Sequence, residues 1–315
     1  MRPIIIFTMI LWLTSCSKEQ SVATEENKQA HKTEQQVDIR LAILPTLDCL
    51  PFVIAKENGI YDSIGLNVKI FLYQSQLNAE KALEKHDVDA CASDLFRIAL
   101  LQFRKIPVKM FFSTNRDWHI VANKALRINQ MKQMGGRIIA ITRNSVNDRL
   151  CDEATIKVNE TKGPTLKAQI NNISIRKSML LAAQVDAAVL PQPSALVAET
   201  KGHTCLYKTG ASLQDYAGLA VQTTSQHTIT KEKVKQLREG YDLAVLKLIK
   251  QKRLAINRKT QRLFALEEVI DSILPQTAFK LSSDVSSEKA IQAVTWLKNR
   301  DQVPASYTPD TLLYK

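Results

Sequence analysis

Two short stretches decide the fold: "HDVDACASDLF" (86–96) and "QVDAAVLPQPS" (184–194). Each contains the triplet Val-Asp-Ala, with a helix-like segment before it. After each triplet come a short apolar run, polar or Pro-rich residues, and a new helix-like segment. This order is typical of a buried strand whose carboxyl end leads through a loop into a helix. The sequence therefore predicts the same strand–helix junction twice, with a long insert between.

Strands and helices alternate outward from both junctions. Around the first junction we expect strands at 37–45, 66–73 and 106–113, and helices at 51–59, 75–86 and 94–105. Around the second we expect strands within 131–142, 165–172 and 204–209, and helices at 144–157, 175–184 and 194–202. A strand at 216–224, an amphipathic helix at 231–249 and two helical segments near 259–273 and 286–299 follow. This alternation predicts mainly parallel sheets flanked by helices, an α/β fold.

The repeated junction predicts two lobes. The chain is expected to build most of one lobe, cross to a second near 121–128, and return near 207–216 to complete the first. Lobe I then comprises 38–125 plus 216–315, and lobe II comprises 126–215. Because ligands of open α/β sheets bind outside the carboxyl ends of the strands, two such edges facing each other predict a ligand cleft between the lobes.

The N-terminus has the pattern of an export signal. Arg2 precedes the apolar run "PIIIFTMILWL", which is too short to span a bilayer, and "LTSC" at 13–16 resembles a bacterial lipobox. We expect removal of residues 1–15, lipidation of Cys16, and a disordered tether over 16–37 that lacks aromatic residues. An ordinary secretory signal is the alternative. The expected location is outside the cytoplasmic membrane, anchored by lipid on the periplasmic or cell-surface side.

Charge and cysteines exclude some functions. The chain carries a net charge of +12, of which residues 231–262 contribute +8. This segment is either the solvated face of helices or a docking surface for an anionic membrane or a partner. A lipidated exported protein does not meet nucleic acid, so nucleic acid is not an expected partner. Cys49, Cys91, Cys151 and Cys205 show no metal-binding spacing, although one disulfide is possible outside the cytoplasm. No metal and no cofactor are expected.

Several of these stretches together resemble a known family. "LPFVIAKENGIYDSIGLNVKI", "ALEKHDVDACASDLF", "QMKQMGGRIIAI", "LLAAQVDAAVLPQP" and "LREGYDLAVLKL" are similar to the type II periplasmic binding proteins of the nitrate/sulfonate/taurine group. That group includes binding proteins for the pyrimidine precursor of thiamine (NMT1/THI5-like). The first junction departs from the family pattern, because His86-Asp87 stands where the family has Gly. The resemblance covers most of 38–300 and implies the two-lobed periplasmic binding protein type II fold.

The resemblance also implies a function. Such proteins are the substrate-binding subunits of ABC importers, so a small solute, an ABC permease and its ATPase are the implied partners of a monomer. The implied solute is a taurine- or sulfonate-like zwitterion or the thiamine pyrimidine precursor. A ligand-sensing exported protein is one alternative. An enzyme of pyrimidine or menaquinone synthesis on the same fold is another, although the chain has no GxSxG, HExxH, Walker or GxGxxG motif and no catalytic residue is predicted.

The candidate ligand-binding residues lie in loops at the carboxyl ends of strands. The family pattern and the polar character of these loops give ten candidates: Thr46, Asp48, Ser93, Asp94, Thr114, Asn115, Asn144, Ser145, Asn147 and Gln192. The helix start at "RNSVND" (143–148) offers N–H donors, or only an ordinary helix cap. Asp94 is also an expected helix cap, whereas Asp48 has no expected structural duty. Trp118 and His119 either line the cleft or belong to its wall.

Asp48 gives a first prediction of the solute's charge. If its carboxylate is free to face the solute, a solute with donors or positive charge at one end is favoured. Taurine-like zwitterions and aminopyrimidines satisfy this condition. Nitrate and simple sulfonates satisfy it less well, because two nearby anions repel each other.

Overall fold

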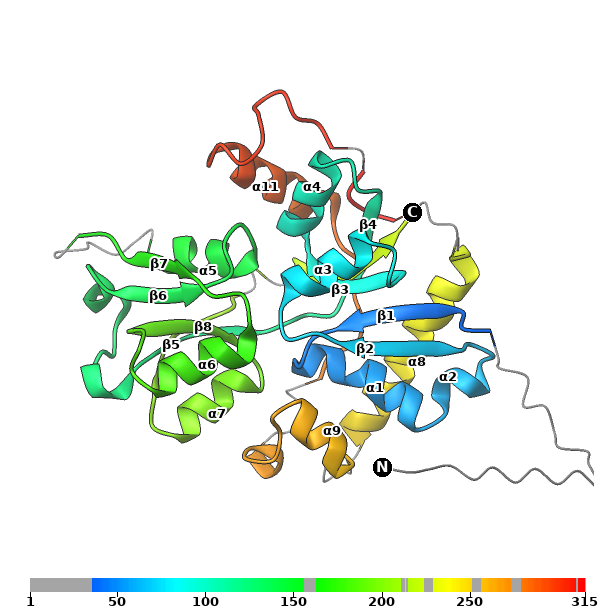
Figure 1. The fold of residues 1–315 in the computed structure, drawn as a ribbon, viewed down its shortest axis with the longest axis horizontal. Helices are drawn as coiled ribbons and strands as arrows, with labels where there is room; N and C mark the ends of the chain where they lie inside the picture. Colours follow the sequence, from blue (N-terminus) through cyan, green and yellow to red (C-terminus); the bar gives the residue numbers. More distant parts are fainter. Residues whose placement is uncertain are drawn as a thin grey trace, which may run out of the picture. The chain divides into compact units, whose positions relative to one another are not determined.

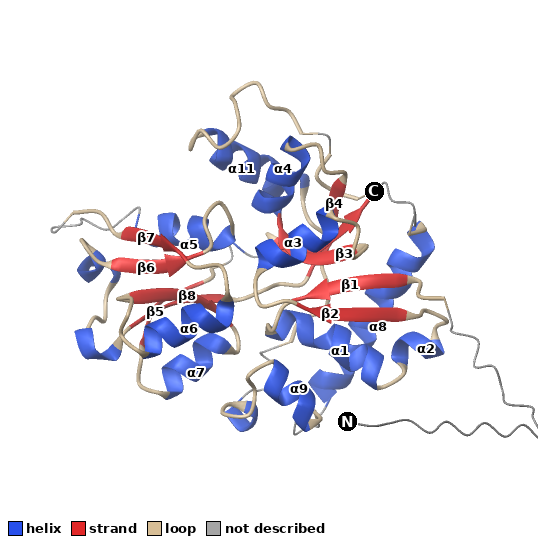
Figure 2. Ribbon diagram, viewed as in Figure 1, coloured by secondary structure: helices blue, strands red, loops and turns tan. Residues whose placement is uncertain are grey.

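The computed structural model describes residues 36–155, 163–210, 213, 215–223, 229–250, 256–272, 279–309 and 311–314. Within this part of the chain, two five-stranded sheets are flanked by helices, as Figures 1 and 2 show. The predicted signal peptide, Cys16 and nearly all of the tether lie outside the described residues. No helix of the described part is both long and apolar enough to cross a bilayer.

The sheet of lobe I has the strand order β2-β1-β3-β10-β4. Its strands are β1 (Ile39–Ile43), β2 (Val68–Leu72), β3 (Ala90–Asp94), β4 (Val108–Ser113) and β10 (Ala217–Gln222). The helices of this lobe are α1 (Leu50–Glu57), α2 (Ile60–Ser63), α3 (Gln76–Glu84), α4 (Leu95–Phe103), α8 (Lys231–Lys250), α9 (Arg258–Leu263) and α11 (Ser287–Lys298), with short 3₁₀ turns at η1 (Leu47–Cys49) and η5 (Ile270–Ser272).

The sheet of lobe II has the order β7-β6-β8-β5-β9. Its strands are β5 (Trp118–Ala122), β6 (Ile138–Ile141), β7 (Leu166–Gln169), β8 (Ala187–Pro191) and β9 (Thr204–Lys208). The helices are α5 (Val146–Thr155), α6 (Ile173–Leu181) and α7 (Ser194–Thr200), with 3₁₀ turns at η2 (Lys124–Leu126) and η3 (Met131–Met134).

The expected mainly parallel sheets are confirmed, with one antiparallel strand in each. β10 runs antiparallel to β3 and β4, and β5 runs antiparallel to β8 and β9. The strand at Trp118–Ala122 belongs to the sheet of lobe II, so the chain leaves lobe I before Trp118 and not within 121–128. The antiparallel strands and the earlier crossing have one cause. A chain that crosses directly from the carboxyl edge of one sheet enters the other at its carboxyl edge, and must then run against the parallel strands.

The repeated Val-Asp-Ala triplet has a structural explanation. The carboxylate of Asp89 accepts the backbone N–H of Arg40 at 2.8 Å, and that of Asp186 accepts the backbone N–H of Ile138 at 2.7 Å. In the opposite direction, the N–H of each aspartate donates to the carbonyl of the same residue on the neighbouring strand. Each aspartate therefore fixes the start of its strand, β3 or β8, beside β1 or β6.

The residue two positions before the valine of each Val-Asp-Ala triplet has the same backbone conformation in both junctions. His86 has φ +61° and Ala183 has φ +55°, the left-handed conformation that glycine adopts without strain. The family has Gly at this turn of the first junction, and the turn forms here without it. The two junctions therefore match in backbone conformation as well as in sequence.

Candidate functional site

Loops at the carboxyl ends of strands from the two sheets meet each other. The N–H of Leu47, after β1, donates to the carbonyl of Gln192, after β8, at 2.9 Å. The N–H of Ile173, after β7, donates to the carbonyl of Gln74, after β2, at 2.8 Å. These contacts bring the carboxyl edges of the two sheets together.

A buried ion pair lies at this meeting of edges. Arg116 Nε donates to both carboxylate oxygens of Asp48 at 2.9 and 3.0 Å, and the Thr114 hydroxyl donates to Asp48 Oδ2 at 2.5 Å. The side chains of Arg116 and Asp48 are only 1% and 4% exposed. Burial alone would lower the pKa of Arg116, but the charge of Asp48 raises it, so the guanidinium stays charged. The expectation that Asp48 has no structural duty is therefore wrong, because its carboxylate is occupied by Arg116.

Asp94 joins the two lobes through a second buried carboxylate. Its Oδ1 accepts the N–H of Arg97 and caps α4, as expected. Its Oδ2 accepts the side-chain amide of Gln76 at 2.8 Å and the N–H of Val146, at the start of α5 in lobe II, at 3.3 Å. Burial, with the negative charge of nearby Glu80, raises the pKa of Asp94 to about 6, although Gln76 and Arg97 lower it.

Several buried polar atoms around these carboxylates have no hydrogen-bond partner among the described residues. They include Nη1 of Arg116, the indole Nε1 of Trp118, and both Oδ1 and Nδ2 of Asn147. The Thr46 hydroxyl, which lies beside the Cys49 thiol, is another of these atoms. Arg116 lies over the Trp118 ring at 5.6 Å, and Asn147 follows Val146, which binds Asp94. Arg116 also interacts electrostatically with Asp94, so these residues lie near the contact between the two lobes.

The structure brings most of the predicted site residues to this region. Thr46, Asp48, Ser93, Asp94, Thr114, Ser145, Asn147 and Gln192 all lie in or beside the loops just described. The Ser93 hydroxyl donates to Glu80 at 2.8 Å, and that of Ser145 donates to the carbonyl of Thr142 at 2.6 Å, so these two hydroxyls already have partners. A role of these residues in binding a solute stays a prediction.

Two predicted residues have other partners. The Asn115 amide donates to the carbonyl of Leu281 at 3.1 Å, within lobe I. The Asn144 amide donates to Gln302 at 2.6 Å. The sequence reasoning missed Arg116 as the partner of Asp48. Its place in "STNRDWH", directly after a predicted strand and two residues beyond the candidate Thr114, was the available signal.

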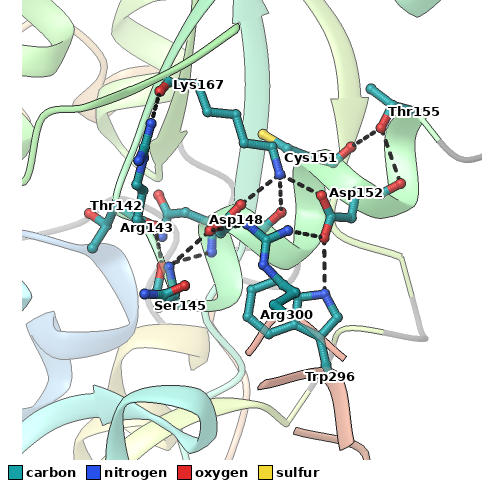
Figure 3. A network of polar contacts seen from close by, with 12 residues as sticks. Thr142, Arg143, Ser145, Asp148, Cys151, Asp152, Thr155, Lys167, Trp296 and Arg300 are labelled. Carbon is teal, nitrogen blue, oxygen red and sulfur yellow. Dashed lines mark hydrogen bonds and ion pairs between the residues drawn. The ribbon is translucent and has the colours of Figure 1, made fainter. Parts of the chain in front are cut away.

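A second polar network joins α5 of lobe II to α11 (Figure 3). Arg300, just after α11, donates to Asp152 at 3.0 Å and lies 3.4 Å from Asp148, and the Trp296 indole donates to Asp152 at 3.0 Å. Lys167, from β7, donates to Asp148 at 2.6 Å and also contacts Asp152. Because Asp148 is fully buried, this network fixes the helix that carries Asn147.

The structure also shows the partners of the basic segment 231–262 and the state of the cysteines. On α8, Lys233 pairs with Asp38, Arg238 with Asp284, and Lys247 donates to Asn58. Part of the basic segment therefore has partners within the chain, whereas residues 251–255 lie outside the described part. Cys49, Cys91, Cys151 and Cys205 are free thiols, and Cys91 is buried as expected.

Comparison with known proteins defines the class of this fold. Two lobes of mixed sheet joined at their carboxyl edges constitute the periplasmic binding protein type II fold, as predicted from the sequence. The model of the family described as NMT1/THI5 like matches residues 46–251. The chain therefore belongs to the NMT1/THI5-like family. No curated protein sequence is significantly similar to it.

Solved structures support the fold at low sequence identity. The nitrate-binding protein NrtA from Synechocystis PCC 6803 gives a TM-score of 0.66 at 13% identity, covering 86% of this chain and 83% of its own. The alkanesulfonate-binding protein SsuA from Xanthomonas axonopodis pv. citri, bound to MOPS, gives 0.65 at 14%, covering 88% and 94%. A ligand-binding component of an ABC-type import system from Staphylococcus aureus, with zinc bound, gives 0.64 at 14%, with the same coverage of 88% and 94%.

Proposed function

We propose that this protein is the substrate-binding component of an ABC importer and binds a small solute with an oxyanion group between its lobes. The observation that carries this proposal is the set of unsatisfied buried polar atoms on Arg116, Trp118 and Asn147. A buried polar group without a partner costs about 1–3 kcal/mol. Such groups gathered at the carboxyl edges of two facing sheets are what a polar ligand would satisfy.

The chemistry of these groups favours an acceptor-rich solute. Arg116 Nη1 and Trp118 Nε1 are donors only, and Asn147 offers both a donor and an acceptor. Because Asp48 is neutralised by Arg116, its carboxylate is not the group that faces the solute. This revises the first prediction of the solute's charge. Sulfonates and taurine-like zwitterions fit better than an aminopyrimidine, whose donors would find fewer acceptors. The proteins NrtA and SsuA, named above as binding nitrate and alkanesulfonate, share this fold.

Two alternative functions, a ligand sensor and an enzyme, can be distinguished from the proposed one by experiment. A ligand sensor would bind the same solute without a neighbouring permease and ATPase, so the gene surroundings and uptake assays distinguish it. An enzyme of pyrimidine synthesis would convert its ligand, whereas a binding protein returns it unchanged. The family model does not separate the two, but the solved structures named above are described as binding proteins.

The proposed location follows from the predicted signal and not from the described residues. We propose that Cys16 is acylated and tethers the two lobes outside the membrane, where they deliver the solute to a permease. Labelled palmitate should be incorporated into the parent and not into Cys16→Ala. Equal incorporation into both proteins, or none into the parent, would contradict the anchor and leave the binding function standing.

A panel of solutes tests the proposed function. The full chain is mixed with taurine, alkanesulfonates, nitrate, bicarbonate, aminopyrimidines and riboflavin, and thermal unfolding is followed. A solute at 100 times its dissociation constant should add about 2.7 kcal/mol to the free energy of unfolding. We expect the largest rise from a sulfonate or taurine. A rise only with aminopyrimidines would overturn the proposed solute class, and no rise with any member or with extracted cell solutes would contradict solute binding itself.

A further inference from the structure

A cluster of metal-ligand side chains lies within lobe II, beside the candidate residue Gln192, whose side-chain amide contacts the ring of His119 at 3.2 Å. It consists of His119 on β5, Glu199 on α7 and Cys205 on β9, and their ligand atoms all lie within 4.8 Å of one another. Because successive residues of a strand point to opposite faces, His119 points away from the face on which Trp118 contacts Arg116. The cluster and the unsatisfied donors around Arg116 are therefore separate features.

The imidazole of His119 is oriented as in metal sites. Asp117 Oδ2 lies 3.1 Å from Nε2 of His119, and Nδ1 faces Glu199 Oε1 at 2.5 Å. A ligating histidine almost always donates its other ring N–H to a carboxylate or carbonyl, which fixes the tautomer and the ring plane. Asp117 supplies that carboxylate and leaves Nδ1 toward Glu199. The thiol of Cys205 is within hydrogen-bonding reach of both His119 and Glu199.

We propose that His119 Nδ1, Glu199 and Cys205 Sγ bind a divalent transition-metal ion of the Zn²⁺ class. One nitrogen, one oxygen and one sulfur ligand suit a borderline-soft ion, whereas Ca²⁺ and Mg²⁺ prefer oxygen ligands alone. Metal–ligand distances of about 2.0–2.3 Å in a tetrahedron place ligand atoms about 3.5 Å apart. Small side-chain rotations of Glu199 and Cys205 would produce that spacing. Three protein ligands leave a fourth position for water or a solute group.

The carboxylates around the cluster favour a cation, although the charge of Lys208 opposes one. The carboxylates of Glu199 and Asp117 lie 2.5 and 3.1 Å from the two ring nitrogens of His119, so two negative charges face the site. The Glu199 side chain is 24% exposed, so an ion can enter from solvent. Lys208 is the nearby cation whose charge acts on Glu199 and opposes binding.

The cluster could not be found from linear spacing. Its three ligands come from a strand, a helix and another strand, and the fold alone brings residues 119, 199 and 205 together. The expectation that the chain holds no metal rested on the absence of closely spaced Cys and His residues. The further proposal does not depend on the solute site.

Cobalt absorption tests the metal site. The full chain, reduced and freed of metal, is titrated with Co²⁺, which reports a bound thiolate by charge-transfer absorption and a tetrahedral site by strong visible bands. We expect both signals to saturate at one equivalent and to disappear when Zn²⁺ is added. Cys205→Ser should lose the charge-transfer band, whereas the matched control Cys151→Ser should keep it. Asp117→Asn should weaken binding by about 10-fold or more, the effect of removing an orienting carboxylate.

Three results would overturn the proposal. They are a parent protein without a thiolate band, a band of equal strength in Cys205→Ser, and a band lost equally in Cys151→Ser. Circular dichroism of each variant shows whether it is folded. If Cys205→Ser is unfolded, Asp117→Asn decides, because Asp117 is half-exposed and not itself a proposed ligand. Unchanged Co²⁺ affinity in Asp117→Asn would then count against the site.

Discussion

Replacing Arg116 by alanine is expected to lower the free energy of unfolding by about 3–5 kcal/mol, the cost of leaving a buried charge without its partner. The variant leaves the carboxylate of Asp48 buried without a positive partner. Its remaining side-chain donors among the described residues are the neutral Thr114 hydroxyl and Cys49 thiol. Denaturant unfolding measures the effect. The same substitution removes the Nη1 donor, so solute binding should also be lost at temperatures where the variant stays folded.

A matched arginine supplies the control for this prediction. Arg104 pairs with Glu84 at 3.4 Å, but the two side chains are 51% and 35% exposed. Exposed pairs contribute about 0–1 kcal/mol, so Arg104→Ala should have little effect. The double variant Asp48→Leu/Arg116→Met should recover much of the lost stability, since an apolar pair often replaces a buried ion pair at little cost. Equal decreases in the free energy of unfolding for Arg116→Ala and Arg104→Ala would show that the buried pair stabilises the fold no more than the exposed pair does.

The second large effect concerns Asp94 and depends on pH. Its pKa in the folded protein is about 6, above the ordinary value of 3.8. The folded state therefore binds the proton more tightly than the unfolded state. The resulting stability is fully present below about pH 3.8 and is lost as pH rises through about 6. At about 1.4 kcal/mol per pKa unit, a shift of about two units corresponds to up to about 3 kcal/mol.

Asp94→Asn isolates this effect, because asparagine caps a helix but does not titrate. The difference in free energy of unfolding, variant minus parent, should become more positive by up to about 3 kcal/mol between about pH 4 and pH 7. The exposed carboxylate of Asp87 provides the matched control, Asp87→Asn. A difference that stays constant with pH for Asp94→Asn, or that moves in the opposite direction, would contradict the buried, proton-retaining carboxylate.

The sequence predicted the repeated unit of the fold because the unit is local. Val-Asp-Ala, the turn before it and the helix after it are contiguous, and their apolar run and cap residues are visible in order. The crossing at 114–117 was misplaced because the sequence predicted no strand at the position of β5, between 113 and 131. Only its pairing with β8 and β9 decides the matter.

The sequence predicted where the loops of the candidate residues lie, but not the ion pair that neutralises Asp48. The loops after the strands were correctly placed at the carboxyl edges, since that follows from strand direction. The state of Asp48 depends on Arg116, which lies 68 residues away in the sequence, and no periodicity connects the two. The cluster of His119, Glu199 and Cys205 was not predicted for the same reason. Long-range side-chain pairing is what the sequence pattern left undetermined.

Calorimetric titration of two variants that each lack one unsatisfied polar group tests most directly that these groups bind a solute. Trp118→Phe removes the indole N–H, and Asn147→Leu removes the amide while keeping the branched shape. Neither breaks a side-chain hydrogen bond made by these groups in the described structure. The solute is the panel member that most stabilises the parent. We predict that each variant stays folded and binds the solute about 10-fold or more weakly, the loss of about 1.4 kcal/mol of binding. Unchanged affinity in both variants, with stability retained, would contradict the proposed site.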